Sequence, residues 1–329
     1  MIRLATVGTS GICEQFIKSI SLVEEIELSA VYSRSAEKGG EFASRYNCKK
    51  VYTDLNQMAE DNQIDAVYIA SPNSFHYKQS RIFLEGNKHV ICEKPITTSL
   101  SEYEELKALA DGKGLIYMEA IMSRHNRSRK NVLSAMKRIG DIRMARIDFN
   151  QRSSRLDSFL SGEQVNIFDM SLRTGTLMDL GVYCVYAAVD MFGIPKSIKA
   201  TSNFFVTGCD SSGCAIFNYG DFSAILTYGK NGQGSLGSEI IGDKGVVKIS
   251  SISLYQGISL FQNGVDTPLS EELSKVEIMS YEAQSFANYI LRYKDYKEEY
   301  SKVSELCADV HYCMDKIKQS AGIIYPDKI

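Results

Sequence analysis

Cys-x-x-Cys pairs are missing from this sequence of 329 residues. Its eight cysteines are scattered, and its four histidines lie far apart from one another. Zinc sites and disulfide frameworks show short, regular spacings of these residues. We therefore expect reduced, buried thiols rather than a metal site or a disulfide framework.

Long apolar runs and basic blocks are also missing. No uninterrupted apolar run approaches the roughly 18 residues that span a bilayer. The net charge is -3, and no basic cluster offers the positive field that nucleic acids require. The chain opens with MIRLATV, which leads directly into a predicted strand without the features of a signal peptide. We expect a soluble, cytoplasmic protein without a membrane or nucleic-acid partner.

The first 120 residues alternate short apolar runs with amphipathic segments. Runs rich in Val, Ile and Tyr, each followed by a helical pattern, predict a parallel sheet covered on both faces. Strands are expected at 3–8, 28–33, 49–53, 66–71, 89–94 and 115–120, and helices near 11–22, 35–46, 54–61, 74–86 and 99–112. This pattern is typical of a doubly wound α/β domain.

Beyond residue 120 the pattern changes to successive strands with short turns, which predicts a largely antiparallel sheet. Strands are expected at 144–150, 197–206, 214–219, 223–228, 238–242 and 246–251, and helices near 125–138, 174–192 and 279–320. The length also favours two domains. We place a dinucleotide-binding domain at 1–121 and a second α/β domain at 122–329.

The turn after the first strand departs from the dinucleotide-binding pattern G-x-G-x-x-G. Gly8 is present, but Ser10 and Cys13 occupy the second and third glycine positions. Backbone amides at a helix N-terminus can still bind a phosphate, and serine and cysteine are small. The candidate phosphate-binding residues are Gly8, Thr9, Ser10, Gly11 and Ile12. An ordinary strand-to-helix turn is the alternative.

The end of the second strand indicates which cofactor would bind. In this fold an acidic residue there holds the 2′-hydroxyl of NAD. The sequence instead has Ser33 and Arg34, which can hydrogen-bond a 2′-phosphate. This favours NADP(H) over NAD(H), the alternative being a solvated surface arginine.

Two further motifs carry ionisable groups. Glu93 and Lys94 end the fifth predicted strand, where doubly wound sheets bind ligands, and the bond to Pro95 is a candidate cis peptide. A salt bridge is the alternative role for Lys94. In GTLMDLGVY at 175–183, Asp179 and Tyr183 are four residues apart and would share one face of an α-helix. A structural pair in the core is the alternative role for them.

With SPNSFHY at 71–77 and MEAIMSRH at 118–125, these motifs resemble the glucose-fructose oxidoreductase/inositol dehydrogenase/MocA (Gfo/Idh/MocA) family over nearly the whole chain. The chain is most similar to its dimeric dihydrodiol dehydrogenase branch. The resemblance implies an N-terminal Rossmann domain and a C-terminal α/β domain whose open sheet often forms a dimer interface. It also implies cofactor-binding roles, which we assign to Ser71, Pro72, Asn73, His76, Glu93 and Lys94. Packing is the alternative role for His76.

These features predict an NADP(H)-dependent oxidoreductase that moves a hydride between nicotinamide and a secondary alcohol or carbonyl. Tyr183 would carry the proton, where many family members have histidine, and Lys94 would lower the phenol pKa from its usual ~10. Asp179 would orient Lys94 or the substrate. The substrate would be a sugar, polyol, dihydrodiol or dicarbonyl, with the polar loop 151–157 closing one side of its pocket. A cofactor-binding regulator without catalytic activity is the alternative.

Overall fold

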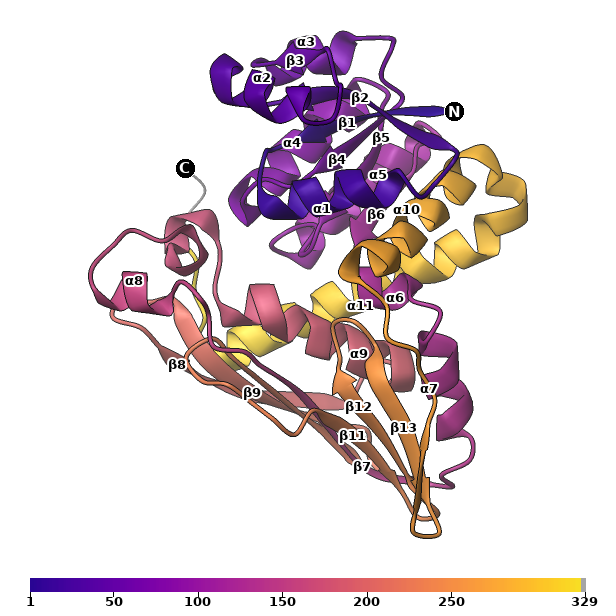
Figure 1. Cartoon of the computed structure of the whole chain (residues 1–329). Helices are drawn as coiled ribbons and strands as arrows, with labels where there is room; N and C mark the ends of the chain where they lie inside the picture. Colours follow the sequence, from indigo (N-terminus) through magenta and orange to yellow (C-terminus); the bar gives the residue numbers. More distant parts are fainter. Residues whose placement is uncertain (327–329) are drawn as a thin grey trace. The chain divides into compact units, whose positions relative to one another are not determined.

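The computed structural model describes residues 1–326 and has two compact units (Figure 1). The first unit comprises Met1–Met122 and Ser274–Glu305, and the second comprises Ser123–Leu273 and Leu306–Ile329. The expected boundary after residue 121 lies next to the first division. Residues 274–305 pack with the first unit, while the assignment of 122–329 to one functional domain stays a prediction.

The first unit contains a six-stranded sheet in the order β3-β2-β1-β4-β5-β6, with every neighbouring pair parallel. Its strands are β1 (Ile2–Val7), β2 (Ile26–Tyr32), β3 (Val51–Tyr52), β4 (Ala66–Ile69), β5 (His89–Glu93) and β6 (Tyr117–Ala120). Its connecting helices are α1 (Gly11–Ile20), α2 (Ala36–Ser44), α3 (Leu55–Glu60), α4 (Asn73–Glu85) and α5 (Leu100–Gly112). The predicted doubly wound parallel sheet is confirmed.

Burial explains why these segments form central strands. All four residues of β4 are buried, as expected for a strand with helices on both faces. Side-chain caps then fix where two of the helices begin. Ser35 accepts a hydrogen bond from the Lys38 amide at the start of α2, and Asp54 accepts one from the Asn56 amide before α3.

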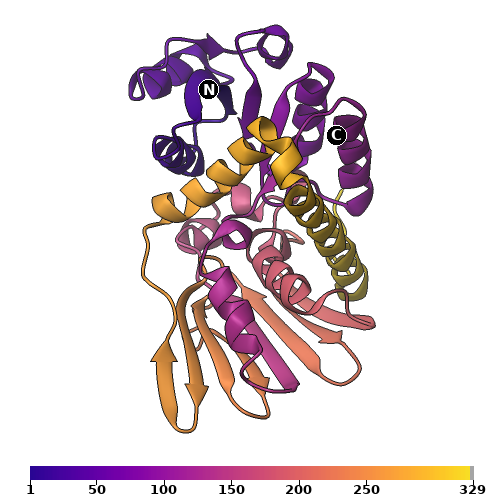
Figure 2. The same ribbon diagram turned by 90° about the vertical axis from the view of Figure 1, so that its right-hand side faces the viewer.

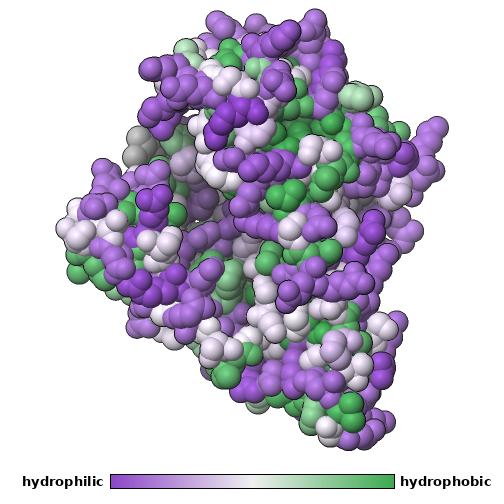
Figure 3. All heavy atoms as spheres, viewed as in Figure 1, coloured by the Kyte–Doolittle hydropathy of each residue, from purple (hydrophilic) through white to green (hydrophobic). Residues whose placement is uncertain are grey.

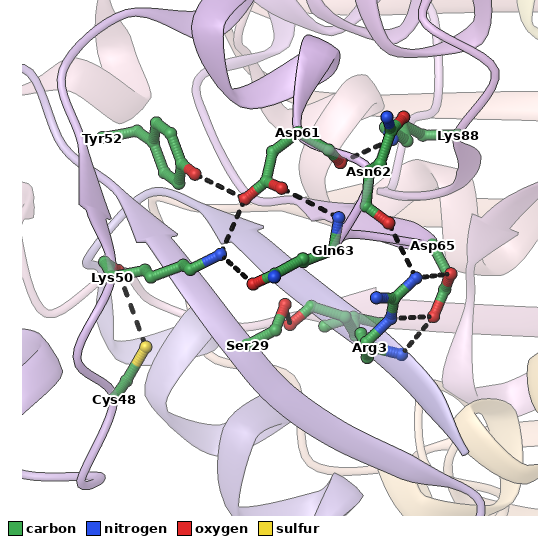
Figure 4. Close-up of polar contacts among 11 residues, drawn as sticks. Arg3, Ser29, Cys48, Lys50, Tyr52, Asp61, Asn62, Gln63, Asp65 and Lys88 are labelled. Carbon is green, nitrogen blue, oxygen red and sulfur yellow. Dashed lines mark hydrogen bonds and ion pairs between the residues drawn. The ribbon is translucent and has the colours of Figure 1, made fainter.

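A polar network ties the amino ends of the strands together (Figure 4). The Arg3 guanidinium at the start of β1 lies 2.6 Å from the Asp65 carboxylate, just before β4. The Asp61 carboxylate accepts hydrogen bonds from Tyr52 at 2.6 Å and from Lys50 at 2.9 Å. These bonds hold the pKa of Asp61 well below its usual range. The network stabilises the edge of the sheet opposite the carboxyl ends of the strands.

The second unit contains an eight-stranded sheet in the order β14-β13-β12-β11-β7-β10-β9-β8. Its strands are β7 (Ile142–Asn150), β8 (Ser197–Phe204), β9 (Asp210–Asn218), β10 (Ser223–Gly229), β11 (Ser238–Gly242), β12 (Val246–Ser251), β13 (Gln256–Gln262) and β14 (Val265–Pro268). Only the β7–β10 pair of this sheet is parallel, so the predicted largely antiparallel sheet is confirmed. The prediction missed β13 and β14. All four residues of β14 are exposed, which leaves no apolar pattern to detect.

One face of this sheet is packed under helices α7 (Arg129–Met136) and α9 (Val182–Phe192) (Figure 2). Along β7, Ala145 and Ile147 face the helices and are buried. Met144 points to the opposite face of the sheet and is 41% exposed. Paired positions on the outer face form an apolar stripe across four strands. The stripe consists of Met144, Ile241, Val246 and Phe261.

Three helix predictions are wrong in their extent. The helix predicted at 279–320 is two helices, α10 (Lys275–Leu291) and α11 (Tyr293–Ala321), because Arg292 leaves the helical conformation with φ -128° and ψ 37°. The helix predicted at 125–138 is α6 (Met122–His125) followed by α7. The helix predicted at 174–192 begins as a π-helix at Leu177–Gly181 before α9.

The helical segment Met170–Phe192 is long and apolar enough to cross a membrane, but 78% of its apolar window is buried inside the structure. The core helix of a soluble protein has the same property, and the packing of α9 on β7 and β10 fits that description. On the face drawn in Figure 3, hydrophilic side chains predominate and hydrophobic ones are scattered among them.

Candidate active site

The turn after β1 requires glycine at position 8. Gly8 has φ +117°, and a Cβ atom there would lie 3.0 Å from the carbonyl oxygen of Ala70 at the end of β4. An L side chain rarely adopts this conformation, so the turn and the close approach of the two strand ends both depend on glycine.

The two replaced glycine positions remain compatible with a phosphate-binding turn. Helix α1 begins at Gly11 with the exposed Ser10 as its N-cap. Cys13 is completely buried, and its thiol donates to the Gly8 carbonyl at 3.2 Å. Burial raises the pKa of Cys13 to about 12, so the thiol is a neutral packing group. Phosphate binding by residues 8–12 stays a prediction, and the turn fits it.

The end of β2 leaves one cation exposed. The Ser33 hydroxyl accepts a hydrogen bond from the Ser35 amide at 3.3 Å. Arg34 is exposed and forms no hydrogen bond or ion pair with any other residue in the described range 1–326. A guanidinium in this state can bind an anionic group of a cofactor, and a 2′-phosphate has the matching charge.

His76 holds two loops at the carboxyl edge of the sheet together. Its side chain is 1% exposed, with Nδ1 2.8 Å from the Pro95 carbonyl oxygen and Nε2 2.8 Å from the Ser71 carbonyl oxygen. The Ser71 hydroxyl donates to Gln79 at 2.6 Å, and α4 starts two residues later with Asn73. His76 therefore packs between the two loops, and its predicted contact with a cofactor stays a prediction.

The segment after β5 separates an anchored acid from a strand-end lysine. Glu93 is buried and accepts hydrogen bonds from the Tyr68 hydroxyl at 2.5 Å and the Lys94 amide at 3.3 Å. Burial raises the pKa of Glu93, while the charge of Lys94 opposes that rise. Lys94 is half-buried directly after β5, and its bond to Pro95 is cis. Glu93 therefore has a structural anchor in Tyr68, and its predicted contact with a cofactor stays a prediction.

In the second unit, Asp179 lies on the π-helix and Tyr183 follows on α9. The Asp179 carboxylate lies 2.7 Å from the Lys230 ammonium. Tyr183 is 6% exposed, and its ring meets Phe149 edge-on at 5.7 Å between centroids. Because π-helical bonds join residues five apart, the α-helical spacing that predicted a shared face does not apply to this segment.

Two further ionisable groups lie beside this helix and were not predicted from the sequence. Lys230 directly follows β10 and is 2% exposed, and Asp210 at the start of β9 is fully buried. Asp210 accepts a hydrogen bond from the Leu177 amide at 2.7 Å, and burial raises its pKa to about 6. A single charged residue next to a strand gives no spacing signal, so only the fold identifies this pair.

The polar loop at 151–157 is fastened to the end of β10. The Gln151 amide donates to the Gly229 carbonyl, and the Ser153 amide donates to the Lys230 carbonyl, both at 2.9 Å. Arg152 lies 2.6 Å from Asp157, which occupies one of the two loop arginines. The loop thus lies beside Lys230, and its role in closing a substrate pocket stays a prediction.

The predicted residues divide between the two units. Gly8 and Lys94 follow β1 and β5, which flank β4 in one parallel sheet. Asp179 and Tyr183 belong to the second unit, as does Lys230. A shared role for Lys94 and Tyr183 therefore belongs to the functional proposal.

The chain matches two family descriptions. Residues 2–121 match an oxidoreductase family with an NAD-binding Rossmann fold, and residues 132–248 match the GFO/IDH/MocA C-terminal domain. The scyllo-inositol 2-dehydrogenase (NADP(+)) of Bacillus subtilis is 36% identical, with 99% of each chain covered. The trans-1,2-dihydrobenzene-1,2-diol dehydrogenase of Xenopus laevis is 28% identical, over 97% of this chain and 98% of the other.

A solved structure of a 3-ketoreductase from Actinomadura kijaniata, in complex with NADP and TDP-benzene, has a similar fold. It aligns with a TM-score of 0.83 over 97% of this chain and 98% of the other, at 21% identity. At that identity the similarity concerns the fold alone.

Proposed function

Because the chain belongs to the Gfo/Idh/MocA family of NAD(P)-binding oxidoreductases, we propose that it transfers a hydride between NADP(H) and a secondary alcohol or carbonyl. The substrate would be a sugar, polyol, dihydrodiol or dicarbonyl. The observation that carries this proposal is the position of Gly8 and Lys94 after β1 and β5, on either side of β4. Doubly wound sheets bind their ligands at the carboxyl ends of such strands.

Several residues of the first unit fit a bound dinucleotide. Gly8 permits the tight turn against Ala70, and α1 directs its amino end toward that turn. Arg34 supports a preference for the 2′-phosphate of NADP(H), and the related Bacillus subtilis enzyme is named for NADP(+). When bound, the cofactor supplies or accepts the hydride.

The protein's own side chains would then manage one proton. Tyr183 is a phenol with limited contact to water, and it would give a proton to the substrate oxygen or take one from it. Lys94 would stabilise the phenolate and polarise the same oxygen, since a nearby cation lowers a phenol pKa. Asp179, paired with Lys230, would orient the substrate.

The proposal also covers assembly and location. The outer face of the second sheet carries the apolar stripe from Met144 to Phe261, together with the pair Ile216 and Ile225. Exposed apolar patches of this kind mark interaction sites, so we propose a homodimer or larger assembly through this face. A small-molecule substrate, a cytoplasmic location and the lack of nucleic-acid or membrane partners remain predictions.

A substrate panel tests the function directly. Purified protein is assayed by absorbance at the nicotinamide band with inositols, sugars, a dihydrodiol and dicarbonyls, each with NADP(H) and NAD(H). Turnover of at least one of them, lost in Lys94→Ala, is the expected result. Tight NADPH binding without turnover of any substrate would instead favour the cofactor-binding regulator.

A further inference from the structure

Lys230 is a buried cation in the second unit. It follows β10 directly, and its side chain is 3% exposed. Its amide donates to the Ser211 carbonyl and its carbonyl accepts from the Ser153 amide, both at 2.9 Å, so the backbone is fixed on both sides. Lysine is almost never fully buried unless its charge is paired. The contacts of the Lys230 ammonium therefore indicate the role of this buried charge.

The ammonium of Lys230 forms an ion pair with a carboxylate. It lies 2.7 Å from the Asp179 carboxylate and 5.6 Å from the centre of the Phe168 ring. Asp210 is a second acid nearby, and the charge of Lys230 opposes the rise that burial causes in the pKa of Asp210. Asp210 already accepts the Leu177 amide of the π-helix, whereas Asp179 is paired side chain to side chain with the lysine.

The two members of the ion pair differ strongly in exposure. The side chain of Lys230 is 3% exposed and that of Asp179 is 38% exposed. The Lys230 ammonium thus lies inside the protein, and the Asp179 carboxylate is the member of the pair that reaches solvent. Buried ion pairs add little net stability, because desolvation of the charges offsets their attraction. An orienting role explains this pair better than a purely stabilising one.

We propose that Lys230 is a positioning residue that holds Asp179 as an ionised acceptor for substrate hydroxyl groups. This inference rests on the proposed function and narrows its substrate class. An ionised carboxylate only accepts hydrogen bonds, so it binds the hydroxyls that neighbour the reacting carbon of a polyol, sugar or dihydrodiol. The oxygens of a dicarbonyl are acceptors as well and gain nothing from this group. The pair therefore selects substrates with adjacent hydroxyls.

The test compares scyllo-inositol with 2,3-butanedione in Lys230→Met, Asp179→Asn and the double variant. Lys230→Met keeps a similar side-chain length but removes the charge. We expect it to weaken scyllo-inositol binding about tenfold or more, which is the usual effect of losing a hydrogen bond to a charged group. The affinity for butanedione should stay within about twofold of that of the unmodified protein. The double variant should bind scyllo-inositol no more weakly than Asp179→Asn, because Lys230 acts through Asp179.

Lys248→Met is the matched control. Lys248 on β12 also lies 2.7 Å from an acid, Asp266, but this pair is on the surface of the same sheet. Loss of the Lys248 charge should leave the binding of both scyllo-inositol and butanedione unchanged. Melting temperature is measured for every variant, and Lys230→Gln replaces Lys230→Met if the latter does not fold. Equal losses for both substrates, or additive losses in the double variant, would overturn the inference and indicate a purely structural pair.

Binding is measured by calorimetry with NADP(H) present, so the result does not depend on turnover. A protein that binds scyllo-inositol in a Lys230-dependent manner without turning over any substrate would refute the proposed function and support the positioning role. Turnover of polyols with unchanged scyllo-inositol binding in Lys230→Met would support the proposed function and refute the positioning role. A protein that neither binds nor converts any member of the panel would overturn both.

Discussion

The imidazole Nδ1 of His76 lies 2.8 Å from the carbonyl oxygen of Pro95, one residue beyond Lys94. The other ring nitrogen faces the Ser71 carbonyl at the same distance. A neutral imidazole has one N–H group, so it can donate a hydrogen bond to only one of the two carbonyls at a time. The buried ring thereby couples the loop after β4 to the loop after β5.

We expect His76→Phe to weaken NADPH binding by roughly tenfold, because the Ser71 and Pro95 carbonyls lose their shared partner and the two loops relax. Fluorescence titration with NADPH measures the change. His89→Phe is the control, since His89 is at the opposite end of β5 and accepts the Ile116 amide. That variant should lose stability but keep its NADPH affinity, and an equal loss of affinity in both would contradict the coupling role.

Tyr183→Phe should lower turnover by about 10² to 10⁴, the usual contribution of a positioned acid or base. NADPH affinity should barely change, because the phenol acts on the substrate. Lys94→Ala should cause a similar loss, and the double variant should be little worse than either single one.

Tyr186→Phe serves as the control for Tyr183. Tyr186 lies on the same helix and is 3% exposed, so it tests the loss of a buried hydroxyl elsewhere on α9. Full turnover in well-folded Tyr183→Phe would remove it as the proton carrier. A drop in melting temperature with unchanged turnover would assign it a structural role.

NADPH should bind at least tenfold more tightly than NADH, and Arg34→Ala should shrink that difference. A charge-assisted hydrogen bond to the 2′-phosphate contributes roughly 1.5 to 3 kcal/mol. Lys38→Ala, an exposed cation on α2, is the control and should leave the preference intact. Equal affinities for both cofactors in the unmodified protein would end the assignment to NADP(H).

Acid should destabilise the first unit through His89. Burial lowers its pKa to about 4 from the ordinary 6.5, and its Nδ1 accepts the Ile116 amide, which requires the neutral ring. The unfolded chain therefore binds more protons between these values, so stability is complete above about pH 6.5 and falls as the pH approaches 4.

Urea unfolding at pH 7 and pH 5 measures this effect. The difference should be about 1 to 2 kcal/mol larger in the unmodified protein than in His89→Asn, whose amide oxygen accepts the same bond but does not titrate. His125, whose pKa burial lowers to about 3, contributes in the same direction to both proteins and cancels. Identical pH dependence in the two proteins would show that His89 is not the responsible group.

A lysine on the apolar stripe should disrupt the proposed homodimer. Met144 is 41% exposed and adjoins Ile241, so Met144→Lys places a charge within the interface. Light scattering at micromolar concentration should give a dimeric mass or larger for the unmodified protein and a smaller mass for the variant. Leu236→Lys, at a 90% exposed site outside the strands, should have no effect. A monomeric unmodified protein would refute the assembly.

The sequence by itself determined the parallel sheet of the first unit. Buried strands such as β4 are continuous apolar runs, and each helix between them has its own amphipathic pattern, so local periodicity was sufficient. Gly8, Lys94 and Tyr183 became candidate site residues because they belong to short sequence motifs, and their roles stay predictions. The break at Arg292 and the π-helix at Leu177–Gly181 carry no such pattern and were missed.

Only the tertiary structure decided which distant side chains meet. Lys230 is 51 residues from Asp179 in sequence, and its burial depends on the pairing of β10 with β7 and β9. His76 contacts Pro95 because β4 and β5 are neighbours in the sheet. Single charged or polar residues have no periodicity, and their partners come from contacts between elements far apart in the chain. The fold therefore brings together groups that sequence patterns leave separate.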